Sequence, residues 1–121
     1  MNNSEKNLLV VDNDEDWLAL LERFFSAEGY KVYSAQTCGG ALKSAAARKP
    51  ACIIVDLNLG GEDGLSVCCA VKADPELKGV PVIILSGADA PEMNCGCTYD
   101  AFVCKAQGVA PLLAAVKKLT A

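Results

Sequence analysis

Short apolar runs recur along the chain, and a polar residue follows each of them. Residues 8–11, 52–55, 82–85 and 101–104 are such runs. The runs at 52–55 and 82–85 are uninterrupted and rich in Ile and Val, which is typical of strands buried on both faces. A shorter strand is expected at residues 30–34. The pattern therefore predicts five strands.

Helical patterns lie between the expected strands. The predicted helices span residues 14–28, 37–48, 65–73 and 110–119. Gly29 is a natural stop for the first helix, and Thr37 is suited to cap the second. Residues 88–100 have poor helical periodicity, so we expect the fourth helix there to be short or irregular. Strands and helices therefore alternate along the whole chain.

This alternation predicts an α/β fold, a single doubly wound (βα)5 domain whose parallel sheet is covered on both faces. Right-handed crossovers leave few topologies for such a sheet. Residues 1–6 are polar and are expected to form a loose or disordered N-terminus, with the domain at residues 7–121. In open sheets of this kind, ligands bind at the carboxyl ends of the strands.

Polar side chains of suitable chemistry follow the apolar runs and would meet at that edge of the sheet. They are Asp12, Asn13, Asp56, Asn58, Ser86 and Lys105. Carboxylate and amide oxygens are hard ligands of the kind that Mg²⁺ takes. A carboxylate such as Asp56 can also act as a nucleophile and form an aspartyl phosphate, whose oxygens Ser86 and Lys105 would contact. Each residue alone is an ordinary loop residue, so the indication lies in their joint occurrence.

Composition and charge exclude several classes of function. The net charge is -4 and the sequence has no basic cluster, so direct nucleic-acid binding is not expected. The apolar runs are far shorter than the ~20 residues of a membrane span, and the polar start lacks a signal-peptide core. A cytoplasmic location is therefore expected. The chain contains no histidine, which excludes a phosphohistidine on this chain.

Together, these motifs resemble the receiver domain of response regulators, the phosphate-accepting module of two-component signalling. The resemblance covers nearly all of the chain. It rests on residues 8–12, 56–64 and 86–87 and on Phe102 and Lys105. It implies a flavodoxin-like fold with five parallel strands in the order 2-1-3-4-5 and five helices. The family acts in phosphorelays, not as an enzyme on other substrates.

The resemblance also implies a role for each polar residue at the strand ends. Asp56 would be the phosphoacceptor, with Mg²⁺ as the cofactor. The implied metal ligands are Asp12, Asn13, Asp56 and Asn58, the phosphoryl contacts are Ser86 and Lys105, and the switch positions are Ser86 and Phe102. The donor would be a sensor histidine kinase or a histidine phosphotransfer protein. The output would be an unknown protein, with this chain a monomer or weak dimer.

Three positions depart from the family pattern. Asn13 stands where an acid is usual, which should weaken Mg²⁺ binding. Gly60 replaces a proline, so a looser loop is expected. Ala106 also replaces a proline, and we predict a trans Lys105–Ala106 bond because a non-proline cis bond costs about 3 kcal/mol. A phosphorylation-impaired pseudo-receiver that binds proteins is therefore the alternative function.

The seven cysteines suggest a further alternative. An odd number without a secretion signal favours thiols over a disulfide framework. A zinc or redox site at Cys95 and Cys97 is a minor alternative, since their spacing differs from the usual C-x₂-C pair. A flavin-binding module is disfavoured because residues 12–16, nearly all acidic, would repel a phosphate.

Overall fold

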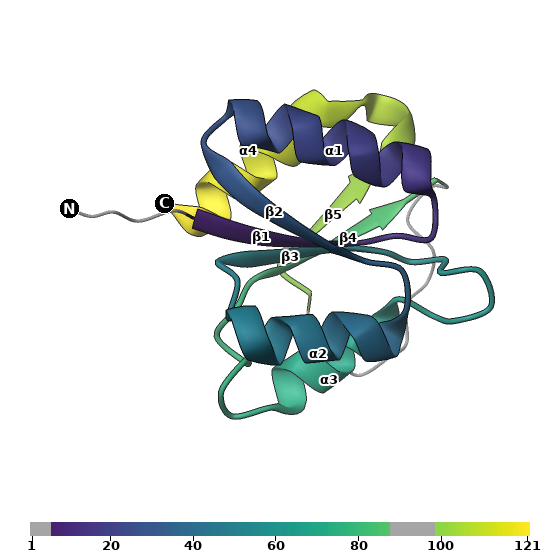
Figure 1. Ribbon diagram of the computed structural model, residues 1–121, viewed down its shortest axis with the longest axis vertical. Helices are drawn as coiled ribbons and strands as arrows, with labels where there is room; N and C mark the ends of the chain where they lie inside the picture. Colours follow the sequence, from purple (N-terminus) through teal and green to yellow (C-terminus); the bar gives the residue numbers. More distant parts are fainter. Residues whose placement is uncertain (1–5, 88–98) are drawn as a thin grey trace.

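The computed structural model describes residues 6–87 and 99–121, which contain a five-stranded parallel sheet (Figure 1). The strands are β1 (Lys6–Val11), β2 (Tyr30–Ala35), β3 (Cys52–Asp56), β4 (Val82–Ser86) and β5 (Ala101–Cys104). Their order in the sheet is β2-β1-β3-β4-β5. The predicted fold class, the parallel sheet and its strand order are confirmed. β1 begins at Lys6, the last residue of the segment expected to be loose.

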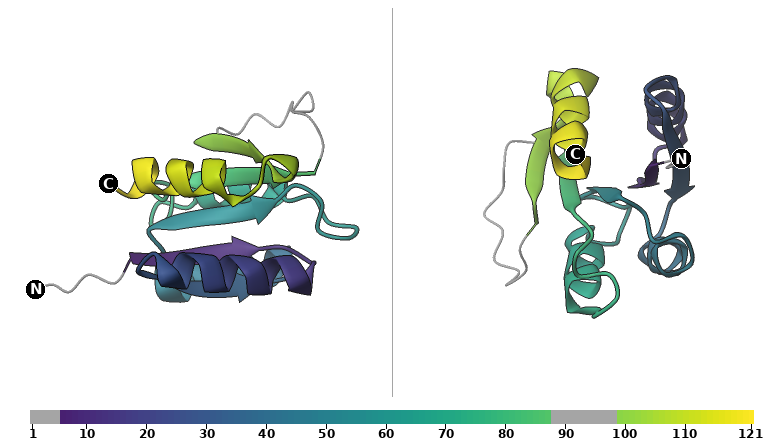
Figure 2. Two further views of the ribbon diagram at one scale, coloured as in Figure 1. Left: turned by 90° about the horizontal axis from the view of Figure 1, so that it is seen from above. Right: turned by 90° about the vertical axis from the view of Figure 1, so that its left-hand side faces the viewer.

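Helices cover both faces of the sheet (Figures 1 and 2). They are α1 (Glu15–Ala27), α2 (Cys38–Arg48), α3 (Leu65–Ala73) and α4 (Val109–Thr120), with a short 3₁₀ turn, η1 (Lys105–Gln107), after β5. α1 and α4 pack on one face, and α2 and α3 pack on the other. The short or irregular helix predicted at residues 88–100 lies almost wholly outside the described residues.

Side-chain caps and glycines set the helix boundaries. The Asp14 carboxylate accepts from the backbone N–H of Asp16 and of Trp17 at 3.0 and 3.3 Å, which starts α1. The predicted Thr37 cap is present, because its hydroxyl accepts from Gly40 N at 3.0 Å. Gly29 follows α1 with φ +92°, a conformation that residues with a Cβ rarely adopt. Local sequence chemistry thus explains why these helix ends were predictable.

The strand register brings the carboxyl ends of the strands to the same level. β3 and β4 are buried along their whole length, as their apolar runs predict. Val11 pairs with Val55, Asp56 with Leu85, and Ser86 with Cys104. The polar residues after β1, β3, β4 and β5 therefore emerge side by side.

The cysteines differ in part from the expectation of free thiols. Cys38, Cys52 and Cys104 are free thiols, whereas Cys69 is disulfide-bonded. Adjacent helical residues point in different directions, so Cys68 is buried against the sheet while Cys69 is half-exposed. Cys95 and Cys97, the residues of the zinc or redox alternative, lie outside the described residues.

Candidate functional site

Three charged side chains from three strand ends meet at the carboxyl edge of the sheet. Lys105 Nζ lies 2.8 Å from Asp12 Oδ2 and 2.8 Å from Asp56 Oδ2. Asp12 is fully buried and Asp56 is 7% exposed. Parallel strand order brings these residues together from positions far apart in the sequence. The structure therefore assembles the acid pair and the lysine that the sequence singled out.

Each carboxylate has one oxygen fixed by the backbone and one facing the lysine. Asp12 Oδ1 accepts from Asp14 N at 3.0 Å, and Asp56 Oδ1 accepts from Asn58 N at 3.1 Å. Lys105 donates a hydrogen bond to Asp56 Oδ2. Its contact with Asp12 Oδ2 is an ion pair only, and that oxygen accepts no hydrogen bond from the described residues. One buried carboxylate oxygen is thus incompletely satisfied.

The charges at the site do not balance. Burial raises the pKa of Asp12, and the Asp56 charge adds to the rise, although the Lys105 contact opposes it. For Lys105, burial lowers the pKa, but the two carboxylates outweigh this effect and the net shift is upward. Lys105 therefore stays protonated. With both acids ionised, the site has two negative charges against one positive charge, which favours a further cation.

Several hydrogen bonds close the loop that follows Asp56, and the expectation that Gly60 makes it looser than a proline would stays a prediction. Asn58 forms an isolated antiparallel bridge with Asp63. Leu59 N donates to Glu62 O, and Gly60 N donates to Asn58 Oδ1, both at 3.0 Å. Gly60 and its neighbour have φ +65° and +112°. Glycine allows this sharp reversal without strain.

Gly64 permits a close backbone approach at the end of the same loop. A Cβ at residue 64 would overlap the backbone oxygen of Asp56. Gly64 N also donates to Leu57 O at 2.8 Å. Only a residue without a side chain fits here. The Asp63–Gly64 pair quoted for the family resemblance therefore has a steric basis.

Two of the departures from the family pattern share one contact. Asn13 is exposed at the rim of the site, and its Nδ2 would lie 2.7 Å from a Cβ at residue 60. The amide thus packs over the space left by Gly60. The Asp14 carboxylate caps the N-terminus of α1. It does not restore the acid missing at residue 13.

The remaining predicted residues lie on neighbouring strands. Ser86 is buried at the end of β4. Phe102 is half-buried in β5, and its ring centroid lies 6.3 Å from that of Tyr99. The Lys105–Ala106 bond is trans as predicted, since no peptide bond of residues 6–87 or 99–121 is cis.

Sequence reasoning missed two residues at this edge. The Trp17 ring centroid lies 5.3 Å from Lys105 Nζ, a contact that the place of Trp17 in the predicted first helix does not indicate. Glu62 Oε1 accepts from Cys38 N at 3.0 Å, which joins the loop after Asp56 to the start of α2. The sequence carries no signal for either contact, because both depend on which strands are neighbours.

The donor set suits a small, hard cation but has few charges. Asp12 and Asp56 offer carboxylate oxygens, and the incompletely satisfied Asp12 Oδ2 lies at the site. Within the described ranges, no group of three or more His, Cys, Asp or Glu residues is placed to hold a metal ion. Among the described residues, the candidate site therefore contributes two carboxylates.

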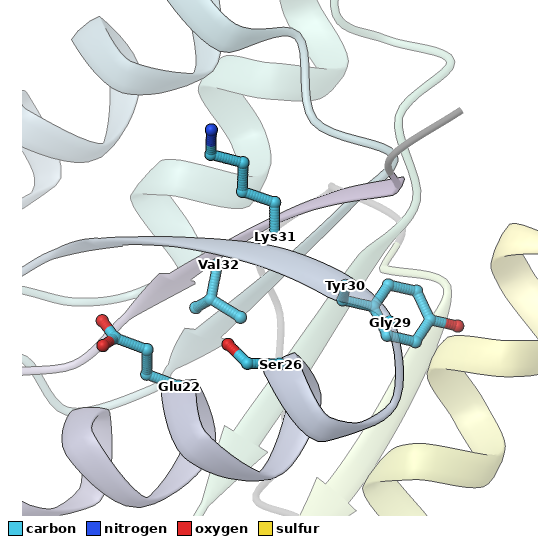
Figure 3. A pocket seen from close by; sticks show the side chains of 6 residues that line it. All are labelled: Glu22, Ser26, Gly29, Tyr30, Lys31 and Val32. Carbon is cyan, nitrogen blue, oxygen red and sulfur yellow. The ribbon is translucent and has the colours of Figure 1, made fainter. Parts of the chain in front are cut away.

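A separate groove lies at the other end of the sheet (Figure 3). It has a volume of about 470 Å³ and runs between the second half of α1 and the start of β2. Its lining residues are Glu22, Ser26, Gly29, Tyr30, Lys31 and Val32. The groove contains neither the acid pair nor Lys105, and it is open to solvent. The carboxyl edge of the sheet remains the candidate site.

Comparison with known proteins gives the same assignment. Residues 8–117 match the model of the response regulator receiver domain. The chain is 36% identical over 117 residues to the transcriptional regulatory protein PrrA of Mycobacterium tuberculosis, covering 93% of this chain and 48% of PrrA. It is 38% identical over 82 residues to the response regulator PleD of Caulobacter vibrioides, covering 68% of this chain and 18% of PleD. This chain belongs to the response regulator receiver domain family.

A solved structure is also similar to this chain. The response regulator TrrA of Thermotoga maritima, crystallised in complex with Mg²⁺-BeF, has a TM-score of 0.85 at 27% identity, covering 94% of this chain and 98% of TrrA. The curated relatives PrrA and PleD are longer, and this chain spans half of their length or less. No helix in the described part is long and apolar enough to cross a membrane.

Proposed function

We propose that this chain is a phosphoacceptor receiver in which Asp56 takes a phosphoryl group from a phosphohistidine on a partner protein. The partner would be a sensor histidine kinase or a histidine phosphotransfer protein. The observation that carries the proposal is the sharing of Lys105 by the two buried acids at 2.8 Å. The modified domain would then present a changed surface to an output protein. Direct nucleic-acid binding has no part in this function.

The proposed step needs one nucleophile and one mobile cation. An Asp56 oxygen attacks phosphorus, the new O–P bond forms, and the P–N bond to the histidine breaks. The electron pair of that bond leaves with the imidazole nitrogen. Lys105 already contacts Asp56 Oδ2, so its ammonium is placed to follow the charge onto the phosphoryl oxygens. Ser86, buried at the end of β4, would contact the same oxygens.

The residues that would hold Mg²⁺ are the carboxylates of Asp12 and Asp56, the Asn13 amide and the Asn58 carbonyl. When bound, the ion neutralises charge on the transferring phosphoryl group. Asn13 brings no charge, so we propose a weaker metal site than a second acid would give. The structure of TrrA in complex with Mg²⁺-BeF supports a Mg²⁺ site in this fold, although it does not bear on the strength of binding here.

Intact mass after incubation with acetyl phosphate and Mg²⁺ tests the proposal. We expect the wild-type chain to gain one phosphoryl group, and Asp56→Asn to gain none. Asp63→Asn is the matched control, because Asp63 is an exposed acid of the same loop and should leave the gain in place. A gain that survives Asp56→Asn would contradict the proposal.

The phosphorylation-impaired pseudo-receiver is the second candidate function. It is favoured because the metal site would have only two acids. Asn13→Asp distinguishes the two functions. If the wild-type chain gains no phosphoryl group at any Mg²⁺ concentration but Asn13→Asp does, the missing acid has inactivated the site. If both gain it, with Asn13→Asp saturating at lower Mg²⁺, the chain is an active receiver with weak metal binding. Isothermal titration with Mg²⁺ measures the affinity of each variant independently.

A further inference from the structure

The turn that carries Lys105 is weakly supported by its own backbone. η1 contains three residues, and none of them is buried. Its hydrogen bond runs from Gly108 N to Lys105 O at 3.0 Å, and Ala106 and Gln107 are exposed. Packing of the turn therefore does little to fix the lysine. The position of the ammonium depends on the groups that it contacts.

Among the described residues, three groups lie close to the Lys105 ammonium. Asp12 Oδ2 and Asp56 Oδ2 each lie 2.8 Å away, and the centroid of the Trp17 ring lies at 5.3 Å. A cation within about 6 Å of a tryptophan centroid gains a cation–π attraction. The ammonium donates a hydrogen bond to Asp56, and its charge also faces the Asp12 carboxylate and the indole ring. The side chain is only 22% exposed, so this attraction is weakly screened.

Trp17 is held on its other sides. Its backbone N–H donates to Asp14 Oδ1 at 3.3 Å, and Asp14 N donates in turn to Asp12 Oδ1 at 3.0 Å. The side chain is half-buried and packs against the apolar layer beneath α1 and α4. Asp12, Asp14, Trp17 and Lys105 thus form a closed ring of contacts. The buried indole Nε1–H has no hydrogen-bond partner among the described residues, so packing alone holds the ring against which the lysine rests.

We propose that Trp17 is a positioning residue that holds the Lys105 ammonium between Asp12 and Asp56. The ring supplies the restraint that the exposed η1 turn does not. Without it, the long lysine side chain would sample other rotamers and spend less time near the acids. The effect on phosphorylation rests on the proposed function, whereas the positioning itself does not.

The positioning is tested first by spectroscopy in the absence of metal and phosphodonor. A lysine under an indole experiences a ring-current shift, so the Lys105 Cε–H signals should lie upfield in the wild-type NMR spectrum. Trp17→Leu should return them to ordinary lysine values, and Trp17→Phe should retain part of the shift. Phe24→Leu is the matched control, since Phe24 is another half-buried aromatic residue of α1. Unchanged Lys105 signals in Trp17→Leu would overturn the proposal.

Fluorescence gives a second measurement, because Trp17 is the sole tryptophan. Lys105→Met should shift its emission. Lys117→Met should not, since Lys117 pairs with Glu28 elsewhere on the surface. Equal effects of the two substitutions would count against the contact.

The functional consequence is measured with acetyl phosphate. Trp17→Leu should slow phosphorylation about fivefold, the rate equivalent of one cation–π contact, and Trp17→Phe should recover most of the rate. Phe24→Leu should match the wild type. If no variant is phosphorylated, the proposed function fails while the NMR result still decides the positioning. If Trp17→Leu shifts the lysine signals but reacts at the wild-type rate, the ring positions Lys105 without consequence for the reaction, and this part of the inference is overturned.

Discussion

Two lysine–aspartate clusters sit at opposite ends of the same sheet. At the carboxyl end, Lys105 lies between Asp12 and Asp56. At the amino end, Lys72 of α3 pairs with Asp100, just before β5. Both lysines are 22% exposed, and each contact with a carboxylate is 2.8 Å. The two clusters are therefore alike in distance and in lysine exposure.

They differ in how completely their polar groups are satisfied. Lys72 also donates to Val80 O at 3.1 Å, and Asp100 Oδ2 also accepts from Val82 N at 2.7 Å. One acid faces one lysine, and the backbone takes up the remaining bonds. At the carboxyl end, two acids share one lysine, and Asp12 Oδ2 lacks a hydrogen bond within the described chain. A balanced cluster holds a structure together, while a cluster with excess charge is suited to exchange its cation.

The largest expected effect on the free energy of unfolding comes from a steric overlap. Gly64→Ala should lower the free energy of unfolding by about 3 kcal/mol, because its methyl group would overlap Asp56 O and overpacking is costly. Gly79→Ala, at the amino end, should change it by less than about 0.5 kcal/mol, since nothing lies within 4 Å of its Cβ position. Urea denaturation measures both. Similar losses in the two variants would mean that the carboxyl end is no more tightly constrained than the amino end.

Removing one carboxylate charge at each end of the sheet should change the free energy of unfolding in different directions. Asp100→Asn should destabilise the fold by about 2 kcal/mol, because Val82 N and Lys72 lose a charged partner. Asp12→Asn should be neutral or stabilise it by about 1 kcal/mol, because it removes a buried charge that its surroundings do not fully satisfy. Urea denaturation at neutral pH without divalent ions measures both.

A comparable loss in Asp12→Asn and Asp100→Asn would contradict this difference between the two ends. Addition of Mg²⁺ gives a further control. It should stabilise the wild-type chain and the Asp100→Asn variant, and it should have little effect on Asp12→Asn.

The amino end should also show a pH dependence of its own. Burial raises the pKa of the Cys52 thiol to about 12, and the Asp100 charge adds to the rise. Above a pH of about 9 the unfolded thiol loses its proton while the folded one keeps it, so stability falls as pH rises towards 12. The slope is about 1.4 kcal/mol per pH unit. Cys52→Ala should remove this contribution, measured by urea denaturation at pH 8 and pH 10.

Cys38→Ala is the control for that measurement, because Cys38 lies at the start of α2 and is half-exposed. It should leave the difference between pH 8 and pH 10 as in the wild-type chain. A wild-type slope in Cys52→Ala would show that other groups cause it.

The smallest expected effect on stability concerns an ion pair that is exposed to solvent. Lys49 and Glu76 are 3.5 Å apart, with side chains 66% and 75% exposed. Glu76→Gln should change the free energy of unfolding by no more than about 0.3 kcal/mol, because exposed ion pairs contribute little. Thermal unfolding alongside Asp100→Asn tests this value. A loss as large as that of Asp100→Asn would mean that burial does not distinguish the two pairs.

Much of the fold could be predicted because the sequence features that indicate it are local. The runs at 52–55 and 82–85 became β3 and β4, and the Thr37 cap and the Gly29 stop were found as predicted. The hydrogen bonds that close the loop after Asp56 were not predicted. Glycines at 60 and 61 allow both loose and tight conformations, and the sequence does not indicate which hydrogen bonds will close the turn.

Some features of the candidate site likewise follow from the sequence, and others follow from the tertiary structure. The polar residues at strand ends and their order are properties of the sequence, since they follow from residue type and local periodicity. The loss of one acid at Asn13 is visible in the sequence only through its resemblance to the receiver family. The sharing of Lys105 by Asp12 and Asp56, its contact with Trp17 and the close approach at Gly64 come from the tertiary structure. These contacts depend on strand order and register. Both are set when the helices pack on the sheet and bring together segments that are far apart in the chain.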